Sequence, residues 1–108
     1  VLVRAEAARL AGYQKDASVL TKPLMKMLAE PSVEVRRSVV RSLGWLEVKA
    51  AYPAIRGLLA DSDAGMRQTS LRALEHIDPD QTRTLPELGQ LTSDPDPAVA
   101  RKAAAIQR

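Results

Sequence analysis

Apolar residues recur along this chain at the spacing of an α-helix. Over residues 33–46, Val35, Val39, Leu43 and Leu46 stand three or four positions apart, so they share one face of a helix. Similar runs return at 64–77 and at 97–108. The pattern predicts an all-α protein.

A two-residue marker shows that these runs are copies of one unit. Val35-Arg36 returns about 31 residues later as Met66-Arg67, and a matching pair stands earlier at Val3-Arg4. A fourth copy falls at Val99-Ala100. A period of this length is typical of a solenoid, in which each helix pair buries its apolar face only against neighbouring pairs.

The residues that flank the marker predict where each helix begins and ends. Ser32, Asp63 and Asp96 stand four positions before the second residue of the pair, and such side chains cap free amides of a first helical turn. Gly12 and Gly44 stand eight positions after it. We expect these glycines to end the helices in a left-handed conformation.

A second helix precedes each marked helix and carries a proline near its start. Pro23, Pro53 and Pro86 are each followed by apolar residues two and five positions later. The chain is therefore expected to form a single domain of one partial repeat, 1–13, and three full repeats, 14–47, 48–78 and 79–108. The predicted helices cover residues 1–13, 17–29, 33–46, 50–60, 64–77, 82–92 and 97–108.

The repeated pattern resembles the HEAT-like repeats of the short bacterial, phycobilisome-lyase type. The matching runs are residues 52–61 for the first helix and residues 35–46 for the second. The resemblance implies a right-handed α-α superhelix of about three helix pairs plus one leading helix. It also implies a surface for protein interaction, lined on its concave side by the second helices.

A further mark of the family is an acidic residue at the end of the first helix with an Arg six positions later. Here the pairs are Glu30 with Arg36 and Asp61 with Arg67. The resemblance implies that such pairs tie neighbouring repeats together, so these residues are expected to be structural.

Neither the composition nor the motifs of the chain favour an enzyme. The 108 residues contain no Cys and one His, so neither a thiolate metal site nor a cluster of His ligands can form among them. No Gly-rich phosphate loop or nucleophile motif is present. We expect no catalysis, no cofactor and no metal. No membrane span or signal-peptide pattern is found, and the compartment stays open, with the cytoplasm favoured.

When the copies of the repeat are aligned, equivalent residues form columns, and one of these columns is not explained by packing. Arg9, Arg41 and Arg72 stand five positions after the marker Arg, on the second helices. With Arg37 and Trp45 they form the expected contact surface for a partner, because Arg suits carboxylates and phosphates and Trp anchors interfaces. The alternative is an ordinary solvated helix face, which the small net charge of +3 favours.

The sequence thus predicts a non-catalytic scaffolding module with a basic concave surface and a protein partner, for which an acidic protein is one candidate. Two alternatives stay open: nucleic-acid binding through the Arg columns, and an accessory domain of a larger lyase-like or redox enzyme. Neither end of the chain resembles a polar capping repeat. We therefore expect a segment of a longer array, with self-association through uncapped ends as one consequence.

Overall fold

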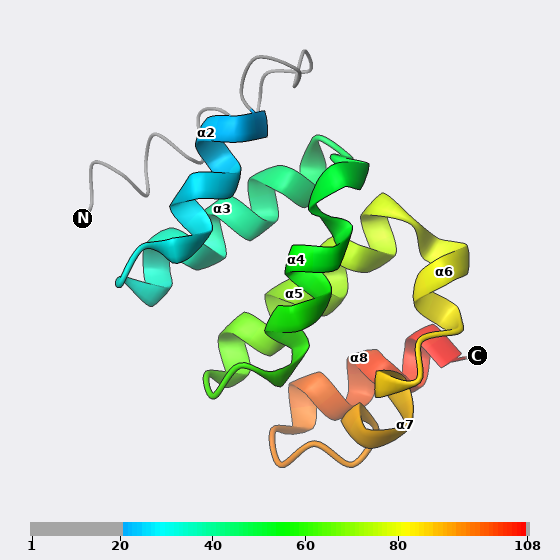
Figure 1. The fold of residues 1–108 in the computed structure, drawn as a ribbon. Coiled ribbons are helices and arrows are strands. Elements are labelled where there is room, and N and C mark those ends of the chain that lie inside the picture. The colour runs from blue at the N-terminus through cyan, green and yellow to red at the C-terminus, as the bar shows by residue number, and fades with distance from the viewer. Residues whose placement is uncertain (1–20, 108) are drawn as a thin grey trace.

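A computed structural model describes residues 21–107 as a stack of short helices (Figure 1). Within that range every regular element is helical. The α-helices are α2 (Thr21–Lys26), α3 (Val33–Trp45), α4 (Tyr52–Gly57), α5 (Ala64–Ile77), α6 (Pro79–Arg83), α7 (Glu87–Leu91) and α8 (Pro97–Gln107). Three 3₁₀ turns extend them: η1 (Met27–Ala29), η2 (Lys49–Ala51) and η3 (Leu58–Ala60).

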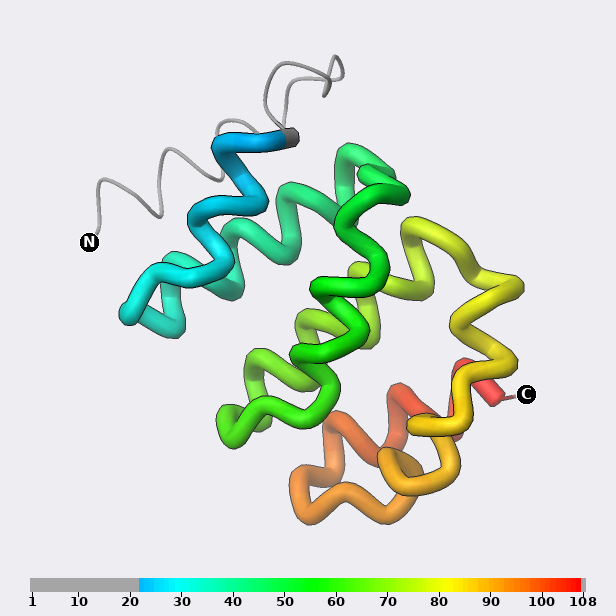
Figure 2. The backbone as a smooth tube through the Cα atoms, in the orientation of Figure 1, coloured from blue at the N-terminus to red at the C-terminus, as the bar shows by residue number. Residues whose placement is uncertain are grey.

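The helices are arranged in successive pairs. The backbone trace passes from α2 and α3 through α4 and α5 to α7 and α8 (Figure 2). The second helices of the pairs are neighbours, because α3 contacts α5 and α5 contacts α8. In Figure 1, α2 and α4 lie in front of this layer. The predicted all-α solenoid is confirmed.

The predicted starts of the second helices are also confirmed. The Ser32 hydroxyl accepts from the amide of Val35 at 3.4 Å, and the Asp63 carboxylate accepts from that of Met66 at 2.7 Å. Asp96 does the same for α8 at 3.1 Å. The helix predicted for 50–60 is present as η2, α4 and η3 together. The helix predicted for 1–13 lies outside the described residues.

The single helix predicted for 82–92 is wrong. Two short helices, α6 and α7, replace it, separated by Thr84, Leu85 and Pro86. Pro86 disfavours helical backbone at the residue before it, so the helix cannot continue through Leu85. The α6 helix begins earlier than expected because the Asp78 carboxylate accepts from the Gln81 amide at 3.1 Å and Pro79 fills the first turn.

The expected left-handed conformation at Gly44 is also wrong. Gly44 lies inside α3, and the residue with positive φ is Glu47, at 53°. The amide of Glu47 donates to the Gly44 carbonyl and that of Val48 to the Leu43 carbonyl, each at 3.1 Å. This is the Schellman arrangement, which satisfies carbonyls left free at a helix end. The conformation expected of the glycine is therefore taken by a residue three positions later.

Gly44 has a packing role instead. A Cβ added to it would lie 2.9 Å from both the Cα and the Cβ of Ala73 on α5. Real Cβ atoms do not approach that closely, so the absent side chain lets α3 and α5 come together at this point.

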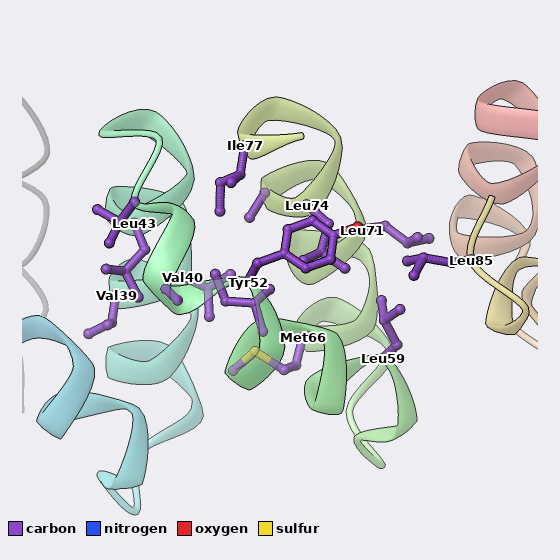
Figure 3. Close-up of a cluster of buried hydrophobic side chains, with 14 of the residues drawn as sticks. Val39, Val40, Leu43, Tyr52, Leu59, Met66, Leu71, Leu74, Ile77 and Leu85 are labelled. Atoms are coloured by element: carbon purple, nitrogen blue, oxygen red, sulfur yellow. The ribbon is translucent and has the colours of Figure 1, made fainter. Parts of the chain in front are cut away.

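Aliphatic side chains from successive pairs form one continuous core (Figure 3). Val39 and Leu43 of α3 are fully buried, as are Met66 and Leu74 of α5. Close packing of such layers replaces the large aromatic core that this composition cannot supply.

A buried chain of hydrogen bonds joins the second helix pair to the third. The Tyr52 hydroxyl and the Thr82 hydroxyl lie 2.8 Å apart, and Thr82 donates to the Asp78 carbonyl at 2.7 Å. Because Thr82 has one proton, it accepts from Tyr52, whose hydroxyl is then the donor. Burial is the main cause of the raised pKa of Tyr52.

The two family Arg residues each reach back to the end of the preceding helix. Arg36 donates to the backbone carbonyls of Glu30 and Pro31, at 2.7 and 2.9 Å. Arg67 donates in the same way to the carbonyls of Asp61 and Ser62, at 2.9 and 3.1 Å. The acceptors are thus main-chain oxygens, so the pairing holds a helix–helix turn.

Arg67 also binds the next repeat. Its Nε and Nη2 donate to the two carboxylate oxygens of Asp94, each at 2.9 Å. The side chains are only 15% and 6% exposed. The hydrogen bond from Arg67 lowers the pKa of Asp94, against an opposing effect of desolvation. A second bidentate pair, Arg56 with Glu87, joins the first helices of the same two repeats and lowers the pKa of Glu87.

We expect Asp94→Asn to destabilise the protein at neutral pH by about 1.5–3 kcal/mol, the usual worth of a hydrogen bond to a charged group. Because the folded-state pKa of Asp94 is depressed, its contribution is present at neutral pH and is lost as pH falls below about 4. Urea unfolding of both proteins from pH 7 to pH 3 should therefore give stability curves that converge in acid.

Asp80→Asn is the matched control, because Asp80 is 91% exposed in its pair with Arg83. It should change the free energy of unfolding little at any pH. A constant gap between wild type and Asp94→Asn across the range would contradict the assignment.

The role of Gly44 predicts opposite effects for two glycine substitutions. Gly44→Ala should lower stability by about 1–3 kcal/mol, because the added methyl overpacks the contact with Ala73. Gly57→Ala should be neutral or stabilise by up to about 1 kcal/mol, since Gly57 is helical and its added Cβ would meet nothing within 4 Å. Denaturant melts of the two variants measure the difference, and equal effects would argue against close packing at Gly44.

Candidate functional site

A groove of about 740 Å³ runs between α3 and α5, and we call it the α3–α5 groove. One wall comes from α3 and the other from α5, neighbouring helices of the same layer (Figure 1). The lining residues are Arg37, Ser38, Arg41, Ser42, Gly44 and Trp45 from α3, and Gly65, Gln68, Thr69, Arg72, Ala73 and His76 from α5.

Two stacked rings mark the register between the walls. The rings of Trp45 and His76 lie 6.4 Å apart by centroid and within 6° of parallel. Arg41 and Arg72 each precede a member of this pair by four residues, about one helical turn on the same helix. Arg41 and Arg72 therefore occupy equivalent positions on opposite walls, which we call the Arg level of the groove.

Among the described residues, carboxylates approach the basic side chains of the groove only toward its two ends. Arg37 has its Nη1 3.9 Å from the Asp63 carboxylate, and its guanidinium lies over the open face of Gly65. At the other end, the Nε2 of His76 lies 4.0 Å from a carboxylate oxygen of Glu47. Both acids lie outside the lining of the groove.

The middle of the groove keeps its positive charge. Arg41 is exposed, and its recorded polar contact is with the Ser38 hydroxyl, at 3.2 Å. Arg72 is exposed and has no hydrogen-bond or salt-bridge partner among the described residues. The pair thus presents guanidinium donors that no carboxylate of residues 21–107 occupies.

Trp45 adds apolar surface beside these donors. It is 47% exposed, the one large hydrophobic side chain exposed to this degree in the described part of the chain. An exposed Trp next to unpaired guanidinium groups is the combination that protein interfaces favour at their centres.

The described residues offer little for catalysis. Between residues 21 and 107 no group of three His, Asp or Glu side chains is placed to hold a metal ion. The groove hydroxyls of Ser38 and Thr69 have no imidazole or carboxylate hydrogen-bonded to them among the described residues. The arrangement fits binding of an anionic group by charge-assisted hydrogen bonds. None of the helices described is long and apolar enough to cross a membrane.

Four of the five residues expected to contact a partner lie in this one groove: Arg37, Arg41, Trp45 and Arg72. The fifth, Arg9, lies outside the described residues. Arg37 differs from the others because Asp63 engages it. Sequence reasoning missed Gln68 and Thr69, which occupy the positions of Arg37 and Ser38 one repeat later. Superposing all columns of the repeat, not only the basic ones, would have found them.

Comparison with protein families supports the repeat architecture directly. A family model described as HEAT repeats matches residues 1–75 and again residues 21–107. Neither the curated proteins nor the solved structures contain a significant match. HEAT repeats are generally protein-interaction and scaffold modules and are typically non-enzymatic. The helix pairs, the nearest-neighbour contacts and the family match lead to one conclusion: the chain belongs to the HEAT-repeat family.

Proposed function

We propose that this chain is a non-catalytic protein-binding module and that its contact surface is the α3–α5 groove. The observation that carries the proposal is that Arg41 and Arg72 line the groove from opposite walls, next to an exposed Trp45, with no carboxylate partner among the described residues. Arg and Trp belong to the side chains most enriched among the residues that dominate binding free energy at protein interfaces.

The rigidity of the walls supports the same proposal. Val40 and Leu43 behind one wall and Leu71 and Leu74 behind the other are fully buried. A surface built on packed helices needs little ordering when a partner binds, so less of the binding free energy is lost.

The distribution of charge favours a protein over nucleic acid. A nucleic-acid backbone carries closely spaced phosphates and is bound best by a long positive surface. Here Asp63 and Glu47 place negative charge near both ends of the groove. The positive region is thus confined to the level of Arg41 and Arg72, which suits one acidic group of a protein partner.

The proposal predicts position-specific crosslinking. A photoreactive residue at Gln68, in the groove, should capture a protein from lysate of the source cell, and nuclease treatment should not reduce the yield. Reversing the charge with Arg41→Glu and Arg72→Glu together should cut the yield by about 10-fold or more, because one favourable contact becomes a repulsive one.

The same photoreactive residue at Gln90, on the exposed face of α7, provides the control, since it should capture little and should not respond to the charge reversal. Arg83→Glu controls for net charge away from the groove. Circular dichroism should verify unchanged helicity in every variant. Loss of the crosslink after nuclease treatment would instead assign the groove to nucleic acid.

A further inference from the structure

The geometry of the α3–α5 groove points to the chemistry of its occupant. We infer that the groove binds an extended peptide segment in which an Asp or Glu side chain lies between Arg41 and Arg72, and an apolar side chain two positions away packs against the Trp45–His76 stack. This inference rests on the proposed function and specifies its partner.

The acidic position follows from the two guanidinium groups. Arg41 on α3 and Arg72 on α5 both line the groove, from equivalent positions of the repeat, and we expect an anion within the groove to reach both. Neither is engaged by a carboxylate of the described residues, whereas Arg37 and His76, at the levels before and after, both have one nearby. One carboxylate at that level therefore gains charge-assisted hydrogen bonds from two sides.

The apolar position follows from the pitch of the walls. Trp45 and His76 stand four residues beyond Arg41 and Arg72, which is about 6 Å along a helix axis. In an extended peptide, side chains two positions apart point to the same side and are separated by about 6.5–7 Å. A segment running along the groove thus places alternate side chains at the Arg level and at the ring level.

The exposed Trp45 makes the second position selective. Trp45 is 47% exposed although its ring already stacks on His76, so part of its apolar surface stays in water. An apolar peptide side chain covering that surface gains from its removal from water. A charged side chain at the same position would gain nothing comparable.

Synthetic peptides test the inference directly on the full chain. Trp45 is the only Trp in the sequence, so its fluorescence reports occupancy of the groove, and calorimetry gives an independent affinity. The probe is a short Ser-rich peptide with one Glu and one Leu two positions away. The first comparison peptide has the Leu adjacent to the Glu, and the second has Lys in place of Glu. The probe should bind at least about 10-fold more tightly than either comparison peptide.

Variants of the protein identify the contacts. Arg41→Gln and Arg72→Gln should each weaken probe binding by about 10-fold or more, because each removes a hydrogen bond between charged groups. Arg83→Gln removes the same charge from exposed α6 and should leave the affinity unchanged. Trp45→Ala, followed by calorimetry, should abolish the preference for the spaced Leu while the preference for Glu over Lys persists.

Several outcomes would overturn the inference. They are equal binding of the two Leu spacings, no binding of the probe up to about 1 mM, and tighter binding of a short oligothymidylate than of any acidic peptide. If crosslinking at Gln68 still captures a protein and depends on Arg41 and Arg72 while the peptides fail, the proposed function stands and the peptide inference falls.

Discussion

The contact between Gly44 and Ala73 is the constraint on which the described surface depends. With no Cβ at Gly44, the α3 backbone approaches Ala73 so closely that any side chain would force a shift. That approach sets the distance and register of α3 against α5, and therefore where Trp45 meets His76 and how the positions of Arg41 and Arg72 lie across the groove. The groove is thus a result of packing behind it, and its charged groups are placed by a residue that carries no functional group.

The fold could be predicted from the sequence wherever a single residue determines a local feature, such as the start of a helix. Caps at Ser32, Asp63 and Asp96 fixed the starts of the second helices, because a short polar side chain satisfies the amides of its own first turn. The errors arose where two demands compete. At Gly44 close packing required the glycine, so the left-handed residue became Glu47, and at 82–92 a proline in the middle of an apolar pattern broke the helix.

The sequence predicted which Arg residues line the candidate site, but not which of their charges are paired with carboxylates. The repeat itself places Arg37, Arg41, Trp45 and Arg72 on one side of the second helices. Which guanidinium groups stay unpaired depends on contacts between repeats, such as Arg37 with Asp63, and these involve residues far apart in sequence. The same limit applied to Arg67, whose carboxylate partner is Asp94 of the following repeat. Ion pairs between side chains of successive repeats cannot be predicted from one set of equivalent positions alone.

The polar chain from Tyr52 through Thr82 has a consequence for how the molecule is assembled. The α6 helix has five residues, too few to be stable alone, and its inward polar group is held by a hydroxyl on α4. During synthesis the Tyr52 side of this contact emerges from the ribosome thirty residues before Thr82. The second pair can thus act as a template on which the third is ordered.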